Sequence, residues 1–227
     1  MPTLIAVTRR RLLWLSVFTI AMAQLEAAVV VYLRTIFYPD GFEFPLVIIE
    51  DHVAAIEVGR EAATVLMFLA LAKLYSAGDR WRQYAAFLWA FGLWDILYYL
   101  WLWVMLRWLS SLLEFDVLFL IPLPWIGPVL APVLISLVMM GAGWAILSLR
   151  DRELPVLVTK MEWAITVGGA ISLIVLFMSD AESVVAGDMP RPFRWFVFAL
   201  FLLLPLAAAQ RAYRRSSDAG DRRSIQA

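Results

Sequence analysis

Long apolar runs separated by short polar segments dominate this chain. A bilayer core of about 30 Å takes about 20 helical residues at a rise of 1.5 Å each. Runs of that length occupy approximately residues 12–33, 52–75, 83–106, 129–149, 161–179 and 193–213. The pattern therefore predicts an all-α fold, a polytopic membrane helix bundle with six transmembrane helices.

Basic residues sort to one side of these spans. That side holds Arg9, Arg10, Arg11, Lys73, Arg80, Arg82, Arg150, Arg152, Lys160, Arg211, Arg214, Arg215, Arg222 and Arg223. The other side keeps Arg34, Arg107, Arg191 and Arg194. By the positive-inside rule, the N- and C-termini are both expected in the cytoplasm. We expect a multi-pass protein that is integral to a bacterial-type inner membrane.

The domain organisation is simple. Residues 1–215 form a single transmembrane helical domain, with no repeat of fixed period. Residues 216–227 are polar, small and charged, a composition that predicts a disordered cytoplasmic tail.

The composition agrees with a membrane protein and excludes several kinds of site and partner. Hydrophobic residues make up 63% of the chain and charged residues only 17%, as expected for an integral membrane protein. The formal net charge is zero, which gives no support to nucleic acid as a partner. Because the chain has no cysteine, thiolate metal sites and cysteine nucleophiles are excluded.

Two connections on the side with few basic residues are long and apolar, at residues 34–51 and 110–128. Their prolines and aromatic residues are typical of interfacial or re-entrant segments, which would be placed to cover a site. Prolines and a glycine between Pro122 and Pro132 resemble a broken or re-entrant helical entry to the fourth span. The alternative is a rigid loop with Pro128 in the first helical turn.

Five charged residues lie inside the spans rather than at their ends. They are Glu26, Glu57, Arg60, Glu61 and Asp95. A charge at mid-membrane costs about 2.5 to 3.5 kcal/mol on insertion scales, so these residues need partners or a function. Counting along the spans places all five in the middle to outer half of the membrane.

Helical spacing groups these residues on facing surfaces. Glu57 and Glu61 are four residues apart and share one helix face, which Arg60 borders. On the third span, Asp95 shares its face with Tyr98 and Tyr99. Small residues beside Glu26 and Asp95 allow close approach of the helices, so we expect the first three spans to pack acid face to acid face.

The expected cluster has four carboxylates and one guanidinium, a formal excess of three negative charges. Like charges in a low dielectric cannot all stay ionised. Bound protons, a metal or inorganic cation, or a cationic ligand must therefore neutralise the cluster.

Three functions are compatible with this cluster. The preferred one is proton or cation handling, with the protein acting as a small coupled transporter. The second is a membrane enzyme in which the acids, with or without a metal, act on a lipid-like or isoprenoid substrate. The third is a structural subunit of a larger membrane complex, in which the charges only fix helix register.

The site residues follow from these readings. Asp95, Glu61 and Glu57 are the candidates for the proton, cation or acid–base role. Other ligand-binding candidates are charged residues of the expected cluster or aromatic residues close to Asp95 in sequence: Glu26, Arg60, Trp94, Tyr98 and Tyr99. A carboxylate-held metal ion would use Glu26, Glu57, Glu61 and Asp95.

The sequence lacks the residues that would bind haem or retinal. Haem ligation by two histidines is excluded because His52 is the only histidine, and its phase places it away from Glu57. A retinal Schiff base needs a mid-span lysine, but Lys73 and Lys160 lie at span ends. The expected partners are the lipid bilayer, a second copy or other membrane subunits, and a lipid-like or ionic small ligand.

Overall fold

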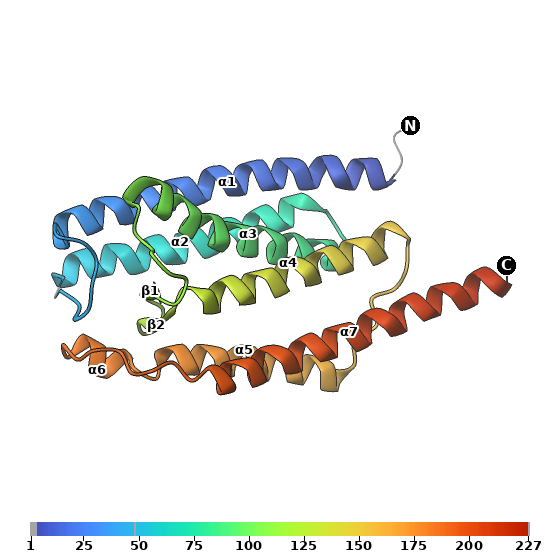
Figure 1. Cartoon of the computed structure of the whole chain (residues 1–227). Coiled ribbons are helices and arrows are strands. Elements are labelled where there is room, and N and C mark those ends of the chain that lie inside the picture. The colour runs from blue at the N-terminus through green and yellow to red at the C-terminus, as the bar shows by residue number, and fades with distance from the viewer. Residues whose placement is uncertain (1–3, 48, 227) are drawn as a thin grey trace.

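The computed structural model describes residues 4–47 and 49–226 and is a bundle of long helices (Figure 1). The helices are α1 Leu4–Phe37, α2 Asp51–Tyr75, α3 Arg80–Leu106, α4 Leu130–Asp151, α5 Lys160–Met178, the short α6 Ala181–Val185, and α7 Trp195–Gln226. Each of the six predicted runs corresponds to one long helix, so the helical prediction is confirmed.

Five of these helices are long and apolar enough to cross a membrane: α1, α3, α4, α5 and α7. The protein is therefore a multi-pass membrane protein by helix length and composition. Helix α2 differs because it carries Glu57, Arg60, Glu61 and Lys73. Whether α2 also crosses the membrane depends on whether these polar residues face protein or lipid.

A small antiparallel sheet makes the all-α prediction incomplete. Strand β1, Phe115–Phe119, pairs with β2, Trp125–Pro128, with Val117 opposite Ile126. A hairpin stands in place of both interpretations of this segment, the broken helical entry to α4 and the rigid loop with Pro128 in the first helical turn, because Pro128 ends β2 and α4 begins at Leu130. The physical reason is that the aromatic and β-branched residues of this segment, such as Phe115, Val117 and Ile126, favour strands, and Pro128 lies at the strand end where a missing N–H is tolerated.

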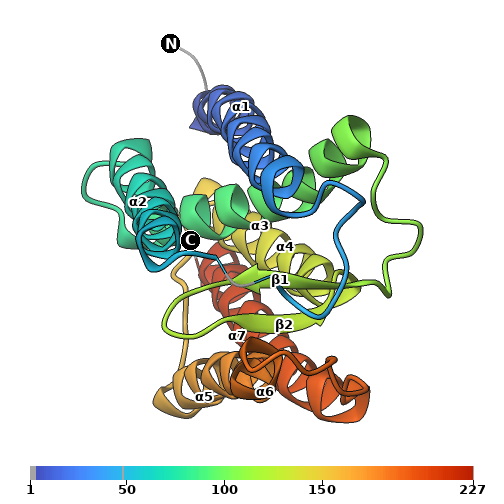
Figure 2. The same cartoon turned by 90° about the vertical axis from the view of Figure 1, so that its left-hand side faces the viewer.

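The bundle has two distinct ends. Figure 1 shows the start of α1 and the end of α7 at one end, which we call the terminal end. The hairpin, α6 and the connection after α1 lie at the other, which we call the hairpin end. Viewed from the hairpin end, α1 and α2 flank α3, and the hairpin crosses between these helices and the pair α5 and α7 (Figure 2).

Glycines allow the helices to approach closely. A Cβ at Gly92 of α3 would lie 2.6 Å from the backbone oxygen of Ser136 on α4. A Cβ at Gly143 of α4 would lie 2.8 Å from the backbone oxygen of Ala85 on α3. These distances are too short for any side chain, so the two glycines set the α3–α4 separation near each end.

The last helix continues beyond the predicted domain boundary. Helix α7 extends to Gln226, so the structure shows helix in residues 216–226, where the sequence predicts a disordered tail. The segment after α4 supports the beginning of this extension. The Leu157 N–H donates to Ser216 Oγ at 2.9 Å, and Gly220 packs under the Leu154 side chain.

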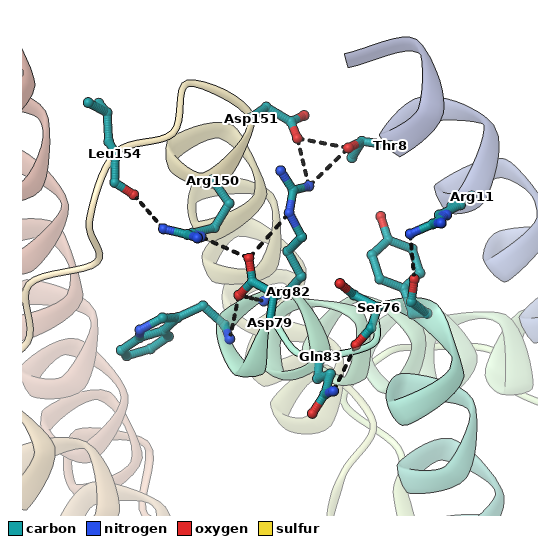
Figure 3. Close-up of polar contacts among 11 residues, drawn as sticks. Thr8, Arg11, Ser76, Asp79, Arg82, Gln83, Arg150, Asp151 and Leu154 are labelled. Atoms are coloured by element: carbon teal, nitrogen blue, oxygen red, sulfur yellow. Dashed lines mark hydrogen bonds and ion pairs between the residues drawn. The ribbon is translucent and has the colours of Figure 1, made fainter. Parts of the chain in front are cut away.

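A charge-balanced network ties the helices together at the terminal end (Figure 3). Arg82 Nη1 lies 2.7 Å from Asp151 Oδ1 and its Nε lies 3.4 Å from Asp79 Oδ2. Arg150 Nε donates to Asp79 at 3.0 Å, and Thr8 of α1 donates to Asp151 at 2.8 Å. We call Thr8, Asp79, Arg82, Arg150 and Asp151 the terminal network.

Asp79 also caps α3 and is the best-solvated acid of this network. Its Oδ1 accepts the backbone N–H groups of Trp81 and Arg82 at 3.0 and 3.1 Å. Burial raises the pKa of Asp79, but these N–H groups and the Arg150 guanidinium outweigh burial, so the net pKa lies below its usual value. The ionised form of Asp79 therefore stabilises the fold.

Candidate acidic pocket at the hairpin end

A cavity of about 200 Å³ lies between α1, α2, α3 and the two connections of the hairpin end. We call it the acidic pocket. Seven of the predicted site residues line it: Glu26, Glu57, Arg60, Glu61, Trp94, Asp95 and Tyr98. The expected packing of three acid faces against one another is what the structure shows. Residues of both connections, among them Phe42 and Phe119, cover the cavity.

Arg60 joins two of the carboxylates. Its Nη2 lies 2.8 Å from Glu57 Oε2, one helical turn earlier on α2. Its Nη1 contacts Glu26 Oε2 across the α1–α2 interface. Glu26 is only 4% exposed, and the Thr64 hydroxyl also donates to it. This part of the pocket is an ion-paired cluster that holds α2 against α1.

The other two predicted carboxylates have neutral partners. Glu61 Oε2 accepts the backbone N–H of Leu120 at 2.8 Å, which connects α2 to the segment after β1. Asp95 Oδ2 accepts the Ser136 hydroxyl of α4 at 2.8 Å. Neither hydrogen bond brings a positive charge. Glu61 and Asp95 are therefore the two acids that need a cation or a proton.

A further ion pair lies at the rim of the pocket. Arg34 Nη2 donates to Asp116 Oδ1 at 2.8 Å, which ties the end of α1 to β1. The Arg34 guanidinium stacks between Phe42 and Trp108, with ring centroids at 4.3 and 3.9 Å. Burial raises the pKa of Asp116 above its usual value, although Arg34 and the Val117 N–H oppose that shift.

Four polar atoms of residues that line the pocket are buried without a hydrogen-bond partner among the described residues. They are Glu26 Oε2, which is ion-paired with Arg60, and Trp94 Nε1, Arg34 Nη1 and Asp116 Oδ2. Buried polar groups are almost always paired with protein, water or ligand. The last three atoms have no ionic contact of their own to account for their burial, although Arg34 and Asp116 pair with each other through Nη2 and Oδ1.

The polar lining ends abruptly toward the terminal end. One turn beyond Thr64 on α2, the Phe68 side chain is 1% exposed. Its ring packs against Phe91 at 6.0 Å and against Trp94 at 5.7 Å. This aromatic cluster separates the acidic pocket from the terminal network.

Two of the singled-out residues lie away from the pocket. Tyr99 is 4% exposed and packs in an apolar core with Ala27 and Leu102. His52 is exposed at the start of α2, where its Nδ1 lies 3.1 Å from Glu50. Within residues 4–47 and 49–226, no three His, Asp or Glu side chains form a group able to hold a metal ion. Geometry thus lends no support to the carboxylate metal site.

Sequence reasoning missed four side chains of this region. Thr64 follows Glu57 by seven residues and shares its face, so helical phase alone would have found it. Ser136 lies on a span without any of the five singled-out charges, and only the close α3–α4 approach at Gly92 reveals its contact. Arg34 and Asp116 were not singled out as site residues, because their pairing depends on the hairpin.

Fold and site together define a multi-pass helical membrane protein with a buried acidic pocket between three helices. No protein-family model, no curated protein and no solved structure matches this chain. The physical chemistry of the pocket is therefore the basis for assigning a function.

Proposed function

We propose that all six long helices cross the membrane, with the terminal end in the cytoplasm. The support for α2 is that Glu57 and Glu61 are 7% and 8% exposed, so its carboxylates face protein rather than lipid. An even number of crossings also agrees with both chain ends lying at one end of the bundle (Figure 1). Most basic residues lie toward that end, as the positive-inside rule requires.

We further propose that the acidic pocket binds protons or cations from the hairpin end. The observation that carries this proposal is the charge of the lining, which has five carboxylates (Glu26, Glu57, Glu61, Asp95, Asp116) and two guanidinium groups (Arg34, Arg60). A purely structural cluster would balance its charges, as the terminal network does. The uncompensated charge centres on Glu61 and Asp95.

Coupled transport needs a second conformation of the bundle. The cluster of Phe68, Phe91 and Trp94 blocks the route from the pocket toward the terminal end. A transporter built on this pocket would have to move α2 relative to α3 to open that route. Binding of protons or cations from the hairpin end alone is the activity that this conformation supports directly.

The enzyme alternative has one observation in its favour. The pocket wall is mostly apolar, with Val30, Leu33 and Phe37 contributed by α1. Such a wall suits a substrate with a hydrocarbon part. An acid–base reaction would then use Asp95 or Glu61, the acids without a positively charged partner.

The test is a proton-exchange titration of the full chain in nanodiscs in weakly buffered solution. Adding cations should release protons from the wild-type pocket, because a bound cation displaces them from the carboxylates. Glu61→Gln and Asp95→Asn should reduce the release, whereas Glu50→Gln, an exposed acid of the same helix end, should not. Equal proton release from all four proteins would refute the proposal.

A further inference from the structure

The acidic pocket combines charged groups with apolar surface, to which inorganic cations do not bind. A hard metal ion prefers six to eight oxygen ligands gathered around one point. The described carboxylates do not gather in that way. Apolar side chains make up most of the lining, including Val30, Leu33 and Phe37 of α1 and Leu118 and Phe119 of the hairpin.

Two acids supply the charge for one bound cation. Glu26 and Glu57 are already occupied by Arg60. Glu61 and Asp95 approach the cavity from α2 and α3, and their hydrogen-bond partners among the described residues are the Leu120 N–H and the Ser136 hydroxyl. An ammonium group, which has up to three N–H donors, can bond carboxylates on both sides of the cavity.

The unpartnered indole N–H of Trp94 adds a requirement beyond charge. Trp94 is 9% exposed and lines the cavity with a buried donor that has no acceptor among the described residues. A bare cation leaves this donor unsatisfied. A ligand that carries an oxygen acceptor as well as an ammonium group satisfies it.

The cavity volume limits the size of this ligand. At about 200 Å³ it lies below the roughly 300 to 1,000 Å³ typical of sites for drug-sized molecules. Trp94 and Tyr98 also line the cavity, with ring centroids 6.2 Å apart, and aromatic rings attract ammonium groups.

We infer that the acidic pocket binds a small organic ammonium ion with an oxygen acceptor and an apolar body. Glu61 and Asp95 bind the ammonium group, the Trp94 indole N–H donates to the oxygen, and the α1 wall contacts the apolar body. This inference rests on the proposed cation binding and names the class of cation. The same ammonium chemistry occurs in soluble amines and in phosphatidylethanolamine headgroups.

Calorimetric titration with 2-phenoxyethylamine tests this inference on the full chain in phosphatidylcholine nanodiscs. The probe has an ammonium group, an ether oxygen and a phenyl ring. We expect saturable binding with one site per chain, and no binding of 2-phenoxyethanol or phenoxyacetate, which share the body but lack the positive charge. Binding of all three compounds alike would overturn the inference, as would the absence of probe binding.

Single substitutions test the proposed role of each part of the site. Glu61→Gln and Asp95→Asn should each weaken probe binding on the order of tenfold or more, because each removes a charge-assisted hydrogen bond. Trp94→Phe removes the indole donor and keeps a ring, so it should weaken binding by a smaller factor without lowering the unfolding temperature. Glu50→Gln should bind as the wild type does, and unchanged affinity in all the pocket variants would place the probe elsewhere.

Other cations distinguish failure of this inference from failure of the proposed function. If Na⁺ or Mg²⁺ releases protons in a Glu61-dependent manner but the probe does not bind, cation handling stands and the organic ligand is wrong. If neither occurs, both proposals fail. If nanodiscs with phosphatidylethanolamine reduce probe affinity only when Glu61 is intact, the ligand is the lipid headgroup, and equal affinities identify a soluble amine.

Discussion

The two ends of the bundle use charged residues in opposite ways. At the terminal end, Asp79 and Asp151 face Arg82 and Arg150, and each charged group is paired with a counter-charge (Figure 3). At the hairpin end, five carboxylates share a cavity with two guanidinium groups, and four buried polar atoms of the lining residues have no hydrogen-bond partner in the described part of the chain. Balanced charges explain helix assembly, whereas the imbalance at the hairpin end calls for a ligand.

The difference also lies in what surrounds the charges. The terminal network lies among helix ends and turns, where its four charged side chains are partly exposed and each carboxylate has a guanidinium partner. The acidic pocket lies between three helices under a hairpin, and its walls are largely apolar. An ionised carboxylate there is energetically costly unless a proton or cation binds it. A cation that neutralises the carboxylate therefore gains binding energy.

The largest expected effect of a single substitution is at Arg60. Arg60→Gln leaves Glu26 and Glu57 buried without a positive charge, which should cost about 3 to 5 kcal/mol of stability. Thermal unfolding in detergent should show a large drop in the midpoint. The double variant Arg60→Gln/Glu26→Gln should recover part of the loss, and a single variant as stable as wild type would contradict the ion-paired description of this cluster.

The next effects are expected at the two glycines of the α3–α4 interface. Gly92→Ala and Gly143→Ala place a Cβ 2.6 and 2.8 Å from a backbone oxygen, so each should cost about 1 to 3 kcal/mol. Gly141→Ala is the control, because nothing lies within 4 Å of its added Cβ. Gly92→Ala should in addition weaken cation binding, because it separates Ser136 from Asp95, and Gly143→Ala should not.

Asp79 gives a smaller effect that depends on pH. Its pKa is lower in the folded protein, so its contribution to stability is present above the unfolded-chain value of about 3.9 and is lost as pH falls through the folded value. Asp79→Asn keeps a capping side chain but should lose stability less steeply on acidification. Asp79→Ala should cost about 1 kcal/mol more at neutral pH, because it also removes the α3 cap.

The smallest effect is expected at His52. This side chain lies outside the pocket and its contact with Glu50 is exposed, so His52→Asn should change stability by less than about 0.5 kcal/mol. Proton release and probe affinity should also match the wild type. A loss of either in this variant would show that the start of α2 belongs to the site.

Helix positions follow from the sequence because hydrophobic run length is a local property. The six predicted runs match α1, α2, α3, α4, α5 and α7, and the spacing of Glu57 and Glu61 correctly placed both on a protein-facing surface. The hairpin at residues 115–128 was not predicted, because strand pairing depends on two segments that meet only after the chain turns at Pro122 and Pro124.

The pocket was predictable only in its charged residues. Glu26, Glu57, Arg60, Glu61 and Asp95 stand out because lipid does not tolerate unpaired charge. The neutral partners do not stand out, since Ser136 and the Leu120 N–H acquire their roles from tertiary contacts. Tyr99 shows the converse error, because a residue on the right helix face in sequence can still turn into an apolar core.

The central claim is that Glu61 and Asp95 exchange protons or cations in the folded protein. Infrared difference spectroscopy of the protein in nanodiscs measures the C=O band of protonated carboxyl groups before and after cations are added. We predict that the wild-type band decreases and that Glu61→Gln and Asp95→Asn each remove part of the change, while Glu50→Gln does not. An identical spectrum before and after cation addition would contradict the account.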